Sequence, residues 1–70
     1  MNYAAVFEKA ERNYSAYVPD LPGCIATGST RKAVEKHIRE AITFHLDGMR
    51  REKLAIPKPK AWAEIIEVAS

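Results

Sequence analysis

Few side chains in this sequence have the spacing of a catalytic site. A nuclease that uses two metal ions needs several carboxylates, which converge on ions about 3.5–4 Å apart. The first alternating segment, residues 3–9, has no carboxylate before Glu8 at its end. The remaining candidates, Glu40, Glu64 and Glu67, are scattered along the chain. We interpret these carboxylates as solvated surface groups and predict that the chain is not an enzyme.

The other reactive side chains are Cys24, His37 and His45. Their spacing matches no recognised pattern of metal ligands, and no carboxylate accompanies either histidine in an acid–base arrangement. Cys24 has no activating base near it in sequence, so we interpret it as a small buried apolar residue. We expect His45 to lie in the core or an interface and His37 on the surface. The sequence predicts neither a metal nor a cofactor.

Length and charge indicate one small domain that associates with another chain. A chain of 70 residues allows a single domain, which buries only about 60% of its unfolded surface. The single cysteine excludes an internal disulfide, so association remains as the means of supplementing the core. The single cysteine also indicates the reducing cytoplasm. No apolar segment approaches the roughly 20 residues of a membrane helix. A net charge of +2 is small for a nucleic-acid-binding protein.

Hydrophobic patterns predict the order strand, strand, strand, helix, strand. The alternating segments that predict strands are residues 3–9, 14–18, 24–27 and 62–68. Ser29 or Thr30 can cap the helix. One apolar stripe then recurs at helical spacing, widened by Phe44. The stripe consists of Val34, Ile38, Ala41, Ile42, His45, Leu46 and Met49.

These elements predict an α+β fold with a four-stranded, mainly antiparallel sheet and one long helix on one face. The right-handed crossover rule places the last strand beside the first, which gives the strand order 3-2-1-4. The uncovered face of this sheet would carry Tyr and Ala side chains. Such a face is a candidate for pairing with another copy of the chain.

Two features suit a contact with a partner. The loop of residues 19–23 contains two prolines and a glycine. Its composition has two possible explanations. The loop serves only to connect two strands, or it is a rigid binding loop that loses little entropy on binding. Trp62 is of a type enriched at interface hot spots, although packing beneath the helix is the commoner fate of a lone Trp in a small domain.

The sequence resembles the HicB antitoxin family, the inhibitory halves of HicA/HicB toxin–antitoxin pairs. The resemblance is carried by YSAYVPDLPGCIATGST at 14–30, IREAITFHLDGM at 38–49 and IPKP at 56–59. It implies a partial ribonuclease-H-like fold and a HicA-like mRNA-cleaving toxin whose catalytic histidine is covered. Many family members carry a C-terminal DNA-binding segment. Here we expect a single domain over residues 1–70, no separate DNA-binding domain, and no operator binding by this chain alone.

We therefore predict a HicB-like antitoxin that sterically inhibits a HicA-like toxin and forms a homodimer or homotetramer. The residues expected to bind the partner are Asp20, Leu21, Pro22, Trp62 and Glu64. The alternative is a stand-alone RNA- or ligand-binding module of the same fold. The helix carries basic residues that could contact RNA, but no aromatic side chains are interleaved for base stacking, which favours a solvated face. These basic residues are Arg31, Lys32, Lys36 and Arg39.

Overall fold

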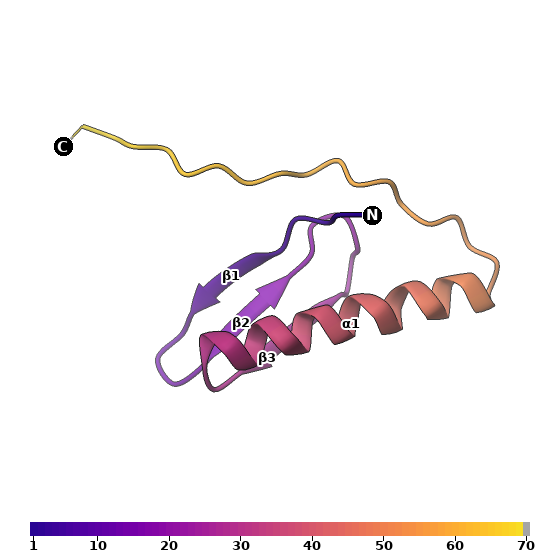
Figure 1. Ribbon diagram of the computed structural model, residues 1–70, viewed down its shortest axis with the longest axis horizontal. Helices are drawn as coiled ribbons and strands as arrows, with labels where there is room; N and C mark the ends of the chain where they lie inside the picture. Colours follow the sequence, from indigo (N-terminus) through magenta and orange to yellow (C-terminus); the bar gives the residue numbers. More distant parts are fainter. Residues whose placement is uncertain (70) are drawn as a thin grey trace.

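The computed structural model describes residues 1–69, which form three strands followed by one long helix (Figure 1). The strands are β1 (Val6–Lys9), β2 (Tyr14–Tyr17) and β3 (Ile25–Gly28). They form an antiparallel sheet in the order β1-β2-β3, and α1 follows at Arg31–Arg51. The predicted α+β class, the order of the first three strands and the position of the helix are confirmed.

The fourth predicted strand, residues 62–68, is not formed in the described chain. Residues 54–69, which we call the C-terminal arm, contain neither helix nor strand and extend from the end of α1 (Figure 1). The last position of the predicted order 3-2-1-4 therefore does not hold for the single chain. A strand forms when its backbone groups pair with the edge of a sheet. Residues 62–69 are all exposed, and their backbone groups pair with no strand of the described chain.

The strand register decides which side chains face the helix. Ala16 lies opposite Phe7 on β1 and Ala26 on β3, and residues opposed in antiparallel strands point to the same face. The helix packs on β2 and β3, so Ala16 is buried while Phe7 on the outer strand remains 47% exposed. The other face of the sheet exposes Tyr17 and Ile25. It therefore carries a Tyr and an Ile rather than the predicted Tyr and Ala side chains.

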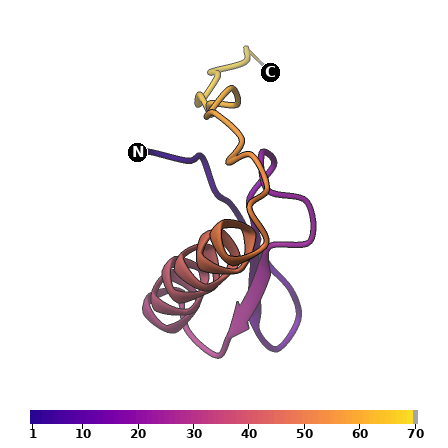
Figure 2. The same cartoon turned by 90° about the vertical axis from the view of Figure 1, so that its right-hand side faces the viewer.

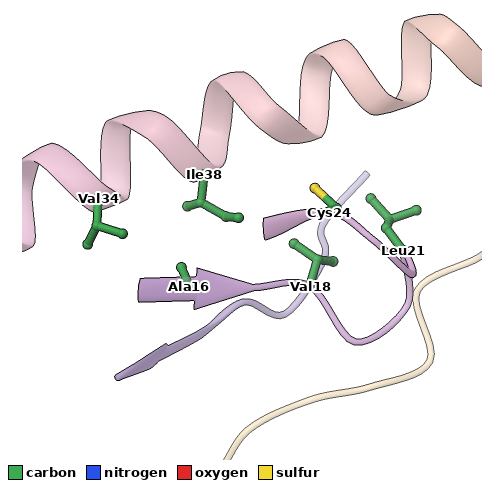
Figure 3. Close-up of a cluster of buried hydrophobic side chains, with 6 residues drawn as sticks. All are labelled: Ala16, Val18, Leu21, Cys24, Val34 and Ile38. Atoms are coloured by element: carbon green, nitrogen blue, oxygen red, sulfur yellow. The ribbon is translucent and has the colours of Figure 1, made fainter. Parts of the chain in front are cut away.

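The core is a small cluster between the sheet, the loop after β2 and the helix (Figure 3). The predicted helical stripe is confirmed at its centre, because Val34 and Ile38 are buried and the later stripe positions are half-buried. Phe44 does not widen the stripe, since it is 77% exposed on the outer face of α1. The buried residues are Ala16, Val18, Leu21, Cys24, Val34 and Ile38.

Local hydrogen bonds fix both ends of α1. The Thr30 hydroxyl accepts a hydrogen bond from the Ala33 amide at 3.0 Å, which is the predicted N-cap. At the other end Lys53 adopts a left-handed φ of 58°, and the Leu54 amide donates to the Met49 carbonyl at 2.9 Å. This Schellman motif ends the helix and releases the chain into the arm. In residues 1–69, no helical run is apolar enough to traverse a bilayer.

Candidate partner-binding surface

The five residues predicted to bind a partner lie on two segments, the loop between β2 and β3 and the C-terminal arm. The loop is held by backbone hydrogen bonds at its base and within it. Val18 donates to the Cys24 carbonyl at 3.1 Å, and Cys24 donates to the Leu21 carbonyl at 3.0 Å. Gly23 permits the reversal through its φ of 83°. These bonds and two prolines make the loop rigid before any partner arrives.

Leu21 lies within this loop but points into the core, where its side chain is 0% exposed (Figure 3). It therefore has no surface for direct contact with a partner, and it holds the loop in place instead. Pro22, the next residue, is exposed. The sequence did contain a signal for this burial. Leu21 is an apolar residue in a loop bounded by two prolines, and the domain has few large apolar side chains with which to build a core.

Asp20 joins the loop to the C-terminal arm. Its Oδ2 accepts hydrogen bonds from the amides of Lys60 at 2.9 Å and Ala61 at 3.0 Å. These two backbone donors, first Ala61 and then Lys60, lower the pKa of the Asp20 carboxyl from its ordinary value. A second anchor lies nearby, because the Tyr3 hydroxyl donates to the Pro57 carbonyl. The first part of the arm is thus held by the body of the domain.

Beyond Ala61 the arm leaves the body of the domain. Figure 2 shows it standing away from the sheet and the helix. Trp62 is 76% exposed, and its indole N–H donates to the Glu64 carboxylate within the arm. Core packing of Trp62 beneath the helix is therefore excluded, and its aromatic faces are available to a partner. The large apolar side chains exposed farther along the arm are Ile65, Ile66 and Val68.

The residues examined for chemistry have structural roles in this fold. Burial raises the pKa of the Cys24 thiol, which therefore stays protonated at neutral pH and is a poor nucleophile. His37 is on the exposed side of α1, with its Nδ1 2.7 Å from the Thr27 carbonyl oxygen, so it joins the helix to β3. His45 is half-buried on the helical stripe. Within residues 1–69, no three His, Cys, Asp or Glu side chains gather closely enough to hold a metal.

A hollow of about 420 Å³ lies between β1 and the first turns of α1. It exists because α1 packs on β2 and β3 and leaves the helix-facing side of β1 uncovered. Its walls combine apolar and charged side chains. They are Phe7, Glu8, Lys9, Tyr14, Arg31, Val34 and Glu35.

Comparison with known proteins identifies the family. The family model for the HicB-like antitoxin of bacterial toxin–antitoxin systems matches residues 3–69, nearly the whole chain. The chain belongs to the HicB-like antitoxin family. The resemblance seen in the sequence is confirmed, and so is the prediction that the chain is an antitoxin of a toxin–antitoxin system rather than an enzyme.

Relatives of this HicB-like chain occur in a phage, a bacterium and an archaeon. A 14.9 kDa protein of Haemophilus phage HP1, from the rep–hol intergenic region, is 38% identical over 58 residues. That match covers 83% of this chain and 44% of the phage protein, so the chain spans less than half of that relative. A UPF0150 protein of Helicobacter pylori is 36% identical over 66 residues, covering 93% of this chain and 92% of the relative.

A second UPF0150 protein, from Thermoplasma acidophilum, is 34% identical over 62 residues, covering 87% of this chain and 90% of the relative. Among solved structures, a chain of the HicA3 and HicB3 toxin–antitoxin complex superimposes with a TM-score of 0.73. The two chains are 28% identical, and the match covers 84% of this chain and 70% of that chain. The sequence comparison and the structural comparison therefore both relate this chain to HicB-type antitoxin systems.

Proposed function

We propose that this antitoxin binds a small HicA-like toxin and inhibits it by covering the surface on which the toxin cleaves mRNA. The observation that carries the proposal is the likeness to a chain solved within a toxin–antitoxin complex, at a TM-score of 0.73. The HicB-like family match over residues 3–69 assigns this chain to the inhibitory side of such a pair. Inhibition by occupying a surface requires shape and charge rather than reactive groups.

The toxin-binding surface in this proposal is the place where Asp20 holds the arm against the β2–β3 loop. Three exposed side chains, Pro22, Trp62 and Glu64, lie on the two segments that Asp20 joins. The loop and the start of the arm are already ordered, so binding costs little conformational entropy. Trp62 supplies the aromatic anchor that interface hot spots favour, and Glu64 supplies charge for a basic partner.

The proposal also concerns residues 62–68, which were predicted to form a fourth strand but are unpaired in the single chain. We infer that residues 62–68 become a strand when the arm docks on a sheet edge, as their alternating pattern predicts. The β1 edge is the position that the predicted order 3-2-1-4 gives to this strand. Because the proposed toxin cleaves mRNA, we place the complex in the cytoplasm, where the lone buried thiol of Cys24 stays reduced.

The test is to look for a neighbouring gene that encodes a small basic protein and to co-express this chain with that protein. We expect this chain to relieve the growth arrest caused by that protein and to copurify with it. Trp62→Ala should raise the dissociation constant of the purified complex roughly 30-fold, as loss of a hot-spot aromatic does. Phe44→Ala is the matched control, because Phe44 is 77% exposed on the far side of the helix and should leave the affinity unchanged.

Three results separate the alternatives. Persistent growth arrest without a complex would contradict the antitoxin mechanism. A complex that Trp62→Ala leaves unchanged would contradict the proposed surface but not the function. Retention of the purified chain on structured RNA, weakening steeply with salt, would instead favour the RNA-binding module.

A further inference from the structure

We infer that the start of the C-terminal arm, residues 58–62, is a binding site for single-stranded RNA. In this site Lys58 and Lys60 contact phosphates, and an unpaired base stacks on Trp62. The inference rests on four observations. They are the concentration of positive charge, the alternation of two cations with an aromatic ring, the exposure of these side chains, and the anchors that hold the segment.

The positive charge of the chain is concentrated around the end of α1 and the start of the arm. Residues 50–60 contain five of the 11 Lys and Arg residues but one of the nine Asp and Glu residues, which gives this stretch a net charge of +4. The other residues together carry a net charge of −2. The small overall charge therefore includes a strongly basic segment, and such a segment attracts a polyanion. The helix dipole accounts for Arg50 and Arg51, but not for the two lysines of the arm.

The two lysines of the arm are available to a ligand. Both are exposed, and the ion pairs formed within residues 1–69 lie on α1 and involve neither of them. The lowered pKa of Asp20 comes first from the backbone amides of Ala61 and Lys60, and the Lys60 ammonium group contributes least to it. The Asp20 carboxylate therefore engages the backbone of the arm, and the ammonium groups of Lys58 and Lys60 are left for a ligand.

Cations and an aromatic ring alternate in this segment, whose sequence over residues 58–62 is KPKAW. The arm is extended here, so alternate residues recur about 6 Å apart along it (Figure 1). Lys58, Lys60 and Trp62 are exposed, whereas Pro57 and Ala61 are half-buried against the body of the domain. The two ammonium groups and the indole ring are therefore presented together to solvent.

This combination suits a single strand of nucleic acid. Proteins bind single strands with cations that follow the backbone and with aromatic rings on which unpaired bases stack. A duplex keeps its bases stacked on one another, so it could use the lysines but not Trp62. The carboxylate of Glu64 accepts a hydrogen bond from the Trp62 indole N–H, and it ends the cationic surface on that side. The phosphates would therefore lie on the lysine side of the ring.

The anchors hold this segment before any ligand binds. Asp20 accepts hydrogen bonds from the Lys60 amide at 2.9 Å and the Ala61 amide at 3.0 Å. The Tyr3 hydroxyl donates to the Pro57 carbonyl at the other end of the segment. Two prolines restrict the backbone between these anchors. Because the backbone is already ordered, binding of a single strand costs little of its conformational entropy.

The proposed function selects RNA over single-stranded DNA as the ligand. Stacking and charge do not read the 2′-hydroxyl group, so the choice comes from the mRNA that the proposed toxin cleaves. This choice rests on the proposed function, whereas the two lysines and the ring form the site with or without a toxin. Trp62 also belongs to the proposed toxin-binding surface, so RNA and toxin would exclude each other at this residue.

The first experiment uses the fluorescence of Trp62, the single tryptophan of the chain. The purified native chain is titrated with an oligouridylate of about 12 nucleotides, and separately with the duplex that this strand forms with oligoadenylate. We expect saturable quenching by the single strand, with a dissociation constant of about 1–100 µM, and little quenching by the duplex. With a dye-labelled strand, Trp62→Ala should weaken binding roughly tenfold, and Trp62→Phe should retain most of the affinity.

The second experiment measures the affinity for the labelled strand over a series of salt concentrations. The variant that combines Lys58→Gln with Lys60→Gln should lower the slope of log affinity against log salt by about 1.4, because each phosphate contact with a single strand contributes about 0.7. The matched control combines Lys32→Gln with Lys36→Gln, which removes the same charge from α1 and should leave the slope unchanged. All four lysines are exposed, so circular dichroism should show the same helix content in every protein.

The third experiment identifies the nucleic acid in cells that express the tagged chain without the toxin. The chain is cross-linked to nucleic acid by ultraviolet light and purified, and the bound strand is labelled. We expect a label that ribonuclease removes and deoxyribonuclease does not, and we expect Trp62→Ala to lose most of it.

Four outcomes would overturn the inference. Trp62 fluorescence might be unchanged by about 100 µM single strand, or the duplex could quench it as strongly as the single strand does. The control pair on α1 could lower the salt slope as much as the arm pair, or the cross-linked strand could be DNA. Because the toxin is absent from all three experiments, failure of the RNA site is distinguishable from failure of the proposed antitoxin mechanism, which the co-expression test measures.

Discussion

The contact between α1 and β3 leaves no room for a side chain at Gly28. A Cβ built at this position would lie 2.5 Å from the Val34 amide nitrogen and 2.9 Å from its Cα. Both neighbours are backbone atoms in the first turns of α1, so the helix itself would have to move. Gly28→Ala should therefore displace the helix from the sheet that it covers.

The expected size of the effect follows from this geometry. Overpacking that forces a backbone shift typically costs about 1–3 kcal/mol of unfolding free energy. For a domain of this length, each kcal/mol changes the melting temperature by about 4–8 °C. We therefore expect Gly28→Ala to melt roughly 5–20 °C below the native chain. The measurement is thermal unfolding by circular dichroism at one fixed protein concentration, because association shifts the melting temperature.

Gly48 provides a matched control with the opposite sign. It lies inside α1, and a Cβ there would meet no atom within 4 Å. Alanine is favoured over glycine by about 1 kcal/mol in a helix interior, so Gly48→Ala should raise the melting temperature. If Gly28→Ala melted at or above the native temperature while Gly48→Ala behaved as expected, the close approach of α1 to β3 would be refuted.

Two further predictions concern the helix end and the arm anchor. Lys53→Gly should raise the unfolding free energy by about 0.5–1 kcal/mol, because glycine adopts a φ of 58° without strain. Denaturant titration measures this change, and a lower unfolding midpoint would contradict the Schellman motif. The folded-state pKa of Asp20 lies below 3.8, so its anchoring holds above 3.8 and is lost as pH falls through that lower pKa. The amide proton shifts of Lys60 and Ala61 should follow this titration, and Asp20→Asn should abolish it.

The sequence was sufficient wherever the deciding interactions are local. Alternation in β1 and β2, the Thr30 cap and the helical stripe depend on residues close together in the chain. These predictions were confirmed, except that β1 begins at Val6 rather than at residue 3 and that Phe44 lies outside the stripe. Family resemblance was likewise carried by contiguous motifs. The antiparallel order of the first three strands followed from short connections, which leave few other arrangements.

The errors arose where distant segments decide the outcome. Alternation at residues 62–68 indicates a strand but does not identify the edge that it pairs with. The contact of Asp20 with Lys60 and Ala61 joins residues about 40 positions apart, and no local pattern signals it. Trp62 is exposed because that contact and the neighbouring prolines hold its segment away from the core. Leu21 is buried because the loop folds inward and adds this side chain to the core cluster (Figure 3).

The same distribution of apolar side chains links partner binding to stability. Within residues 1–69, Leu21 and Val34 are the large side chains that are buried completely, while Trp62, Ile65, Ile66 and Val68 lie outside the core. A domain of about 70 residues has a marginal core, so apolar surface of this size outside it is a large fraction of what could be buried. Any partner that binds only the folded chain and covers the arm stabilises the fold by mass action. Stability and occupation of the arm are therefore coupled, whether a second copy or the toxin provides the cover.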